Sequence, residues 1–247
     1  MVERRYTRVG EFRIHSAHSG SGPPVVLMHG LSGSQGWWRY TMMELAREYT
    51  VIAPELLGFG RTTKPRVLPG LAELAAIMVE WAAQIGIESA NVVGHSMGGQ
   101  LAIHVAAEAP EVVRRLVLVA PAGIPRELGT TALFRLAAEM VPPRRWGRLR
   151  FLPTIALDAA RAGPRVLVIA LQNLLADDVR PLLPRITQRT LLIWGALDPL
   201  VPLAHGEVMN DLLPDARLMV LENAAHNPMV DRPAEFNRAL LAFLRES

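Results

Sequence analysis

The stretch Asn91-Val92-Val93-Gly94-His95-Ser96-Met97-Gly98-Gly99 decides the fold of this chain. Its first residues are typical of a buried strand, whereas residues 97–109 repeat apolar side chains at helical spacing. Ser96 therefore lies on a sharp turn from a strand into a helix, within a Gly-x-Ser-x-Gly pattern. Glycine on both sides of the serine removes side chains that would collide across this turn. The stretch predicts a serine hydroxyl held at the carboxyl end of a strand; the alternative is an incidental serine in a turn of small residues.

Strand-like and helix-like segments alternate on both sides of this turn. Short runs rich in β-branched residues predict strands at 4–9, 11–17, 24–29, 50–54, 91–94, 115–120, 190–195 and 217–221. Apolar periodicity predicts helices near 38–49, 71–85, 97–109 and 233–245, the last with Asp231 as its cap. This order predicts an α/β fold, with a mostly parallel eight-stranded sheet flanked by helices.

The interval 124–188 interrupts the alternation. It is helix-rich, is punctuated by prolines and contains no obvious strand-like run. We interpret it as a helical cap inserted after the sixth strand, over the carboxyl ends of the strands, where open α/β sheets bind their ligands. Residues 1–123 and 189–247 then form the core domain.

His226 is the best candidate for a general base among the seven histidines. A serine hydroxyl is a weak nucleophile at neutral pH and needs a base within hydrogen-bond reach. His226 follows the expected strand 217–221, so it lies at the same edge of the sheet as Ser96. The alternative is a loop histidine that binds a backbone carbonyl. Of the other histidines, three are expected at the surface, namely His15, His18 and His205. Three are expected in structural roles, namely His29, His95 and His104.

Asp198 is the candidate acid that orients His226. A base of this kind needs a buried carboxylate on its other ring nitrogen. Asp198 lies four residues beyond the apolar run of the expected strand 190–195, again at the carboxyl edge, and the order serine, aspartate, histidine is the one expected on this fold. The residues after the strand 115–120 include no carboxylate that competes. The alternative is an Asp-Pro pair that only forms a turn.

Two backbone N–H groups are candidate donors to an oxyanion. The N–H of Met97 lies at the amino end of a helix, where the helix dipole also favours negative charge. The second donor should come from the loop that follows the strand 24–29, and we choose the N–H of Leu31.

The composition limits the class of protein. Half of the 247 residues are hydrophobic, which is enough to bury a sizeable core, and the net charge of +3 is weak evidence for a nucleic-acid partner, so none is expected. No cysteine occurs, and no metal or other cofactor is expected. The N-terminus lacks the apolar core of a signal peptide, and no apolar run approaches the roughly 20 residues of a membrane span. We therefore expect a cytoplasmic protein without a transmembrane segment.

Five motifs in order resemble the α/β-hydrolase superfamily, and most closely its small esterases, lipases, perhydrolases and carbon–carbon hydrolases. They are His29-Gly30, Pro54-Glu55-Leu56-Leu57-Gly58-Phe59-Gly60-Arg61, Gly94-His95-Ser96-Met97-Gly98-Gly99, Trp194-Gly195 with Asp198, and Ala225-His226. The resemblance spans nearly the whole chain and implies the same triad, the same two oxyanion donors and a cap. Glu55 stands where the family usually has Asp. Serine at position 96, where some relatives have Asp, argues against haloalkane dehalogenases and epoxide hydrolases.

The favoured function is hydrolysis of a small hydrophobic carboxylic ester with a short to medium acyl chain. Hydrolysis of carbon–carbon bonds in vinylogous diketones, with the same triad, is the second possibility, and a ligand sensor with slow turnover is the third. The cap decides the substrate. We expect most of its apolar residues to pack against one another, and those on the underside that faces Ser96 to form an acyl pocket; the apolar residues include Leu133, Phe134, Leu136, Leu152, Ile155, Leu157, Val166, Leu167, Ile169, Leu171 and Leu174. A cluster of arginines surrounds Trp146 and is either a solvated face or a patch for anionic lipid or an acidic substrate; it comprises Arg144, Arg145, Arg148 and Arg150.

Overall fold

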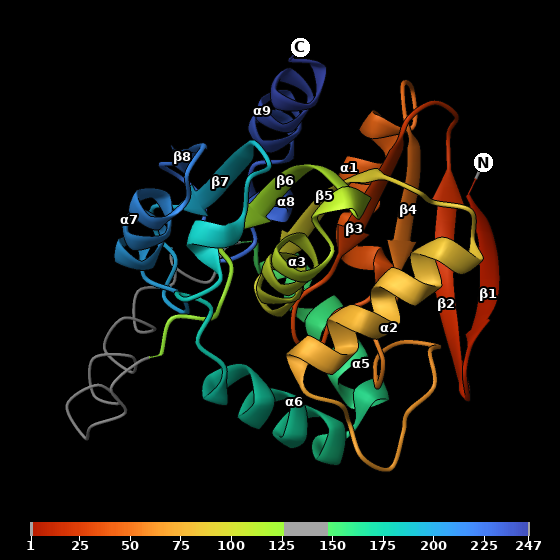
Figure 1. Cartoon of the computed structure of the whole chain (residues 1–247). Coiled ribbons are helices and arrows are strands. Elements are labelled where there is room, and N and C mark those ends of the chain that lie inside the picture. Colours follow the sequence, from red (N-terminus) through yellow and green to blue (C-terminus); the bar gives the residue numbers. More distant parts are fainter. Residues whose placement is uncertain (1, 126–147, 247) are drawn as a thin grey trace, which may run out of the picture.

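A hairpin and a series of parallel strands form one sheet in a computed structural model that describes residues 2–125 and 148–246. The strands follow the order β1-β2-β4-β3-β5-β6-β7-β8 across the sheet (Figure 1). Their bounds are β1 Glu3–Val9, β2 Phe12–Ser19, β3 Pro24–Met28, β4 Thr50–Pro54, β5 Ala90–His95, β6 Val113–Val119, β7 Thr190–Gly195 and β8 Ala216–Leu221. The β1–β2 and β2–β4 pairs are antiparallel, and every other pair is parallel. The sequence prediction of a mostly parallel eight-stranded sheet is confirmed.

The central strands are buried along their whole length because helices cover both faces of the sheet. All six residues of β5 and of β7 are buried. Such runs are typical of parallel strands between two layers of helices. The edge strands β1 and β8 are more exposed, with Arg and Glu side chains along β1.

Helices cover both faces of the sheet (Figure 1). On one face, α2 (Leu71–Gln84) and α3 (Met97–Glu108) pack together and bury Met78, Trp81 and Leu101 against the strands. On the other, α1 (Arg39–Leu45) and α9 (Pro233–Arg245) pack together around Trp38 and Phe236. Three further segments complete the core, namely η1 (Gln35–Trp38), η2 (Pro110–Val112) and α8 (Pro228–Asp231). The sequence analysis did not anticipate α7 (Leu203–Leu212), whose Gly206 lies against the ring of Trp194.

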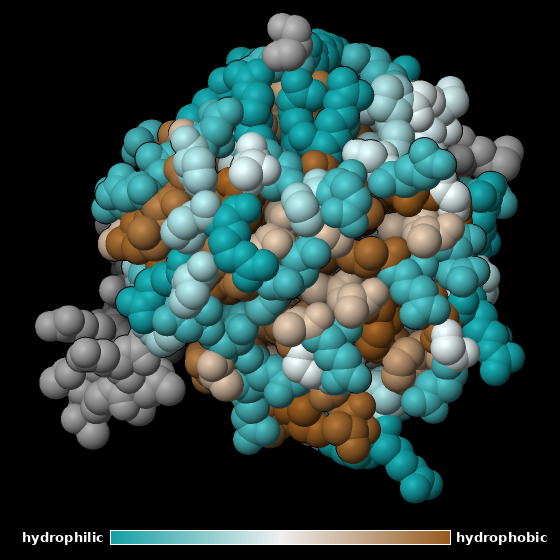
Figure 2. Space-filling model, in the orientation of Figure 1, coloured by the Kyte–Doolittle hydropathy of each residue, from teal (hydrophilic) through white to brown (hydrophobic). Residues whose placement is uncertain are grey.

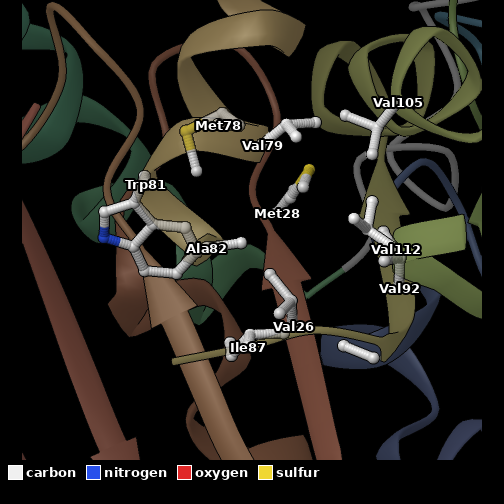
Figure 3. A pocket seen from close by; sticks show the side chains of 11 residues that line it. Val26, Met28, Met78, Val79, Trp81, Ala82, Ile87, Val92, Val105 and Val112 are labelled. Carbon is white, nitrogen blue, oxygen red and sulfur yellow. The ribbon is translucent and has the colours of Figure 1, made fainter. Parts of the chain in front are cut away.

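A small cavity of about 20 Å³ lies between the sheet and the helices α2 and α3 (Figure 3). Its lining is apolar and includes Val26 and Met28 of β3 with Met78 and Trp81 of α2. None of the three candidate triad residues lines it. We interpret it as a packing gap of the core.

The described part of the interval 124–188 is helical, as expected. It contains η4 (Leu149–Phe151), α5 (Leu152–Ala162), α6 (Pro164–Ala176) and η5 (Leu183–Arg185), and no strand occurs in 124–125 or 148–188. The helices α5 and α6 pack on each other and lie together below the sheet in Figure 1. The division of the chain into core and cap at 124–188 stays a prediction.

The cap helices present apolar side chains both to the core and to solvent. Val166 of α6 packs against Gly58 in the loop after β4, and Ala170 is buried. On the outer side of α6, Val168, Leu171 and Leu175 are exposed, and Figure 2 shows apolar surface where this helix lies. The apolar cap residues Leu133, Phe134 and Leu136, and also Arg144, Arg145 and Trp146 of the arginine cluster, lie outside the described residues.

Two sequence predictions are wrong. His15 and His18 are buried in β2, not exposed, because β2 lies between β1 and β4 and its residues from Ile14 to His18 pack into the core. Asp231 does not cap α9, since Arg232 occupies the cap position and Asp231 ends α8.

Within residues 2–125 and 148–246, every helix is too short or too polar to cross a bilayer.

Candidate active site

Ser96 occupies a strained turn between β5 and α3. Its φ of 53° and ψ of −117° lie in a region that residues with a side chain rarely adopt. A Cβ at Gly94 would lie 2.3 Å from the carbonyl oxygen of Gly98, and one at Gly98 would lie 2.5 Å from the carbonyl oxygens of Met28 and His29. The two glycines are therefore required by close backbone packing, as the sequence analysis inferred. Strain of this kind persists only where the surroundings fix it.

The end of β6 holds the turn on its other side. The N–H of Ser96 donates to the carbonyl oxygen of Val119 at 3.0 Å, and the N–H of Ala122 donates back to the carbonyl oxygen of Ser96 at 3.2 Å. Hydrogen bonds in both directions fix the serine backbone relative to the sheet. The serine side chain is left at the carboxyl edge of the strands, where the sequence analysis placed it.

His226 and Asp198 form a buried pair at the same edge. The ring Nδ1 of His226 lies 2.8 Å from Oδ2 of Asp198, and the two side chains are 11% and 1% exposed. The other carboxylate oxygen of Asp198 accepts hydrogen bonds from the N–H groups of Leu200 and Val201, at 2.8 and 3.0 Å. Three donors thus define the position of the carboxylate. A histidine that donates through Nδ1 keeps its Nε2 free to accept a proton, which is the tautomer that a general base needs.

His95 connects this pair to the serine turn. Its ring Nε2 lies 2.8 Å from the carbonyl oxygen of His226, and the two imidazole rings are 4.9 Å apart. Burial lowers the pKa of His95 well below its ordinary value, and the neighbouring His226 lowers it further. His95 therefore stays neutral and donates to the His226 backbone. The structural role expected for it is consistent with this geometry.

The loop after β3 lies against Ser96. A Cβ at Gly30 would be 3.1 Å from the Cβ of Ser96, so the peptide that follows, with the N–H of Leu31, is next to the serine. His29 fixes this loop: its Nδ1 donates to the carbonyl of Gly30 at 2.8 Å, and its Nε2 accepts from the N–H of Leu56 at 3.0 Å.

The other expected oxyanion donor, the N–H of Met97, lies at the start of α3. Met97 is the first residue of that helix, and N–H groups in a first turn have no partner within the helix. The geometry is thus compatible with Leu31 and Met97 as oxyanion donors, and this assignment remains a prediction.

Comparison with known proteins places the chain in a family. A family model described as the alpha/beta hydrolase family matches residues 25–239. The chain belongs to the alpha/beta hydrolase family. It is 31% identical over 271 residues to a 2-hydroxy-6-oxo-6-phenylhexa-2,4-dienoate hydrolase of Burkholderia cepacia, with 96% of this chain and 92% of that protein covered.

Solved structures agree with this assignment. A membrane phospholipase A, described as a bacterial virulence factor, has a TM-score of 0.80 at 28% identity, with 98% of this chain and 86% of that chain covered. A meta-cleavage product hydrolase of Pseudomonas fluorescens IP01 also has a TM-score of 0.80, at 25% identity, with 97% of each chain covered. The resemblance found in the sequence is confirmed at the level of the family.

Asp231 supports the histidine loop of this alpha/beta hydrolase, a role that the sequence analysis missed. One of its oxygens accepts from the N–H of Ala225, the residue before His226, at 2.9 Å, and the other accepts from the N–H of Arg148 at 2.8 Å. Burial raises the pKa of Asp231. The residue therefore ties the histidine loop to the beginning of the described cap segment. In the sequence, only the closeness of Asp231 to His226 indicated that it supports the histidine loop.

Glu55 fixes the loop after β4 in a comparable way. Its carboxylate is buried, accepts from the N–H of Arg61 at 2.6 Å, and lies 3.0 Å from Nδ1 of His15. A Cβ at Gly60 would collide with this carboxylate. Burial lowers the pKa of His15. The glutamate that departs from the family pattern thus fixes this loop and lies against the buried His15.

His104 and Gln100 of α3 bind the end of α6. Nε2 of His104 lies 2.9 Å from Oδ2 of Asp177, and the amide of Gln100 donates to the same oxygen at 2.7 Å. A structural role was expected for His104, and in the structure it binds Asp177. Asp177 thus attaches the described cap to α3, the helix that follows Ser96.

The buried His95 predicts how the stability of this alpha/beta hydrolase depends on pH. Its pKa in the folded protein lies below the ordinary value of 6.5, so at lower pH the unfolded chain binds more protons than the folded one. The free energy of unfolding should therefore decrease as the pH falls below about 6.5, and His95 should contribute up to about 1.4 kcal/mol per pH unit.

Urea unfolding between about pH 7.5 and pH 5 measures this slope. The matched variant is His95→Gln, because glutamine keeps a side-chain donor but does not take up a proton in this range. Its stability should depend less steeply on pH than that of the wild type. Equal slopes for the two proteins would contradict the assignment of a neutral, buried His95.

Proposed function

We propose that this alpha/beta hydrolase cleaves carboxylic esters through an acyl-enzyme, with Ser96 as nucleophile, His226 as general base and Asp198 as the acid that orients the histidine. The observation that carries the proposal is the buried contact of 2.8 Å between His226 and Asp198, at the sheet edge that also holds the strained Ser96 turn. A buried carboxylate together with a strained serine turn indicates a chemical role, because neither feature benefits the stability of the fold. A buried carboxylate and a disfavoured serine backbone each lower stability.

The proposed reaction uses the same histidine twice. Nε2 of His226 accepts the hydroxyl proton as Oγ of Ser96 attacks the ester carbonyl, and the Asp198 carboxylate stabilises the imidazolium that forms. The tetrahedral oxyanion accepts hydrogen bonds from the N–H groups of Leu31 and Met97, each worth about 10²- to 10³-fold in rate. His226 then protonates the leaving alcohol. In the second half of the cycle it removes a proton from water, which releases the acid and restores the serine.

Carbon–carbon bond hydrolysis is the second candidate, and the similarity to dienoate hydrolases favours it. The relative from Burkholderia cepacia is by its printed name a dienoate hydrolase, so its substrate carries a carboxylate. Such a carboxylate is bound most strongly by charge-assisted hydrogen bonds from an arginine or a lysine. Among the described residues the one buried arginine is Arg115, which belongs to the first half of β6 and binds the backbone oxygen of Glu246, away from the carboxyl edge. A neutral ester therefore fits the described site better.

The triad assignment predicts two large and separate losses of activity. Ser96→Ala should lower kcat by roughly four to six orders of magnitude, since the nucleophile is gone. Asp198→Asn should lower kcat by about 10⁴-fold, because the histidine then adopts the wrong tautomer. Steady-state hydrolysis of p-nitrophenyl butyrate measures both.

Matched controls carry the same substitutions at exposed sites. Ser89→Ala, in the loop before β5, and Asp211→Asn, on α7, should retain the activity of the wild type. More than a tenth of the wild-type activity in Ser96→Ala would refute the nucleophile. A dead variant at another carboxylate, with Asp198→Asn active, would refute the acid.

The apolar cap predicts the chain length of the preferred acyl group. Each added methylene should improve kcat/KM by at most about fourfold, the equivalent of about 0.8 kcal/mol, until the pocket is full. A series of p-nitrophenyl esters from acetate to palmitate, compared with a vinylogous diketone acid, measures this preference. Flat values across the series would contradict an apolar acyl pocket. Faster cleavage of the diketone acid would favour the carbon–carbon hydrolase, and a single slow burst would favour a sensor.

A further inference from the structure

A buried carboxylate in the cap points at the loop that carries a proposed oxyanion donor. Asp158 belongs to α5 and is 3% exposed. One of its oxygens accepts a hydrogen bond from Oγ of Ser34 at 2.7 Å and another from Nε1 of Trp37 at 3.1 Å. Arg161 approaches the other oxygen at 3.5 Å, and its side chain is half exposed. The carboxylate is thus held chiefly by two neutral donors of the core, 124 and 121 residues away in the chain.

The first contact fixes the end of the oxyanion loop. Residues 29–34 run from the end of β3 to Ser34, which caps η1 and whose Oγ accepts from the N–H of Gly36 at 3.2 Å. Within the loop, the N–H of Gly33 donates to the carbonyl of Gly30, and Ser32 has a φ of 61°. A left-handed serine is disfavoured and depends on its neighbours. His29 holds one end of this loop, and the bond from Ser34 to Asp158 holds the other.

The second contact, with Trp37, connects Asp158 to His95 and through it to His226. The indole ring of Trp37 lies 5.8 Å from the imidazole of His95 and 5.4 Å from the ring of Phe151. His95 in turn donates to the backbone of His226. A carboxylate that fixes the indole N–H therefore also limits the position of the ring on which His95 packs.

Attachment of the cap does not by itself require Asp158. The contacts of Asp177 with α3 and of Arg148 with Asp231 also join the described cap to the core. A buried carboxylate is unfavourable compared with an apolar side chain of similar size unless its hydrogen bonds serve a purpose. Asp158 binds Ser34, at the end of the oxyanion loop, and Trp37, which packs on His95. The proposed reaction depends on that loop and on His226, to whose backbone His95 donates.

We propose that Asp158 is a positioning residue, through which the cap holds the oxyanion loop at Ser34 and the packing of His95 at Trp37 in their active arrangement. The inference rests on the proposed function of Ser96. It assigns to α5 a part in the rate of the chemical step, and not only in the choice of substrate.

The rate at which a fluorophosphonate labels Ser96 tests this role, because Oγ displaces fluoride while the phosphoryl oxygen occupies the oxyanion site. Asp158→Ala should lower the labelling rate and the kcat for p-nitrophenyl butyrate by about 10- to 100-fold, the size of effect expected from a slight misplacement of catalytic groups. KM should change by less than about threefold. Asp158→Asn should stay within about threefold of the wild type, because its amide oxygen still accepts from Ser34 and Trp37. The matched control is Asp178→Ala, which removes a cap carboxylate bound to Arg180 and should leave both rates unchanged.

A second variant covers the case in which Asp158→Ala does not fold, as judged by thermal unfolding. Trp37→Phe keeps an aromatic ring against His95 but removes the N–H, so it should lower the labelling rate in the direction of Asp158→Ala. Where both fold, the double variant should lose less than the product of the two single effects. Unchanged labelling in both single variants, independent effects in the double variant, or a change confined to KM would overturn the inference. Failure of the wild type to be labelled would refute the proposed function itself and the inference with it.

Discussion

The strained backbone of Ser96 is the constraint on which the rest of the site depends. A residue with φ of 53° at the end of a strand is disfavoured, and here neighbouring strands hold it in place from both sides. Gly94 and Gly98 let the turn approach the end of β3, and the carbonyl of Val119 at the end of β6 accepts its N–H. The core of the sheet therefore determines where the serine side chain lies. The loops that carry the other candidate groups need only reach the same edge.

Parallel strand order brings those loops together. Residues 30, 96, 198 and 226 are far apart in the chain, but each follows a strand of the same sheet, at its carboxyl end. The hydrogen bonds found around them fall into two layers. In one, Asp198 bonds to the candidate base His226; in the other, Asp231, His29 and Asp158 bond to the loops that carry the candidate groups. Two of these outer contacts, at Asp231 and Asp158, involve the described cap segment, so this segment is attached to the candidate catalytic loops.

Much of this arrangement could be predicted from the sequence because its signals are local. The glycines around Ser96, the apolar runs of the parallel strands and the order of serine, aspartate and histidine depend on neighbouring residues or on chain order alone. The buried states of His15 and His18 could not be predicted in this way. They follow from the pairing of β2 with both β1 and β4 and, for His15, from its contact with Glu55. The roles of Asp231 and Asp158 likewise depend on which backbone or side-chain donors the fold brings within reach. Asp158 bonds residues more than 120 positions away, so no spacing rule reveals it.

The most direct test of the account is a crystal structure of the adduct formed with a p-nitrophenyl alkylphosphonate. The account predicts phosphorus bonded to Oγ of Ser96, with the phosphoryl oxygen about 2.7–3.1 Å from the N–H groups of both Leu31 and Met97. Nε2 of His226 should face the serine oxygen while its Nδ1 remains bound to Asp198. Phosphorus on any other residue, or a phosphoryl oxygen that contacts neither N–H group, would contradict the assignment of this edge of the sheet as a serine hydrolase site.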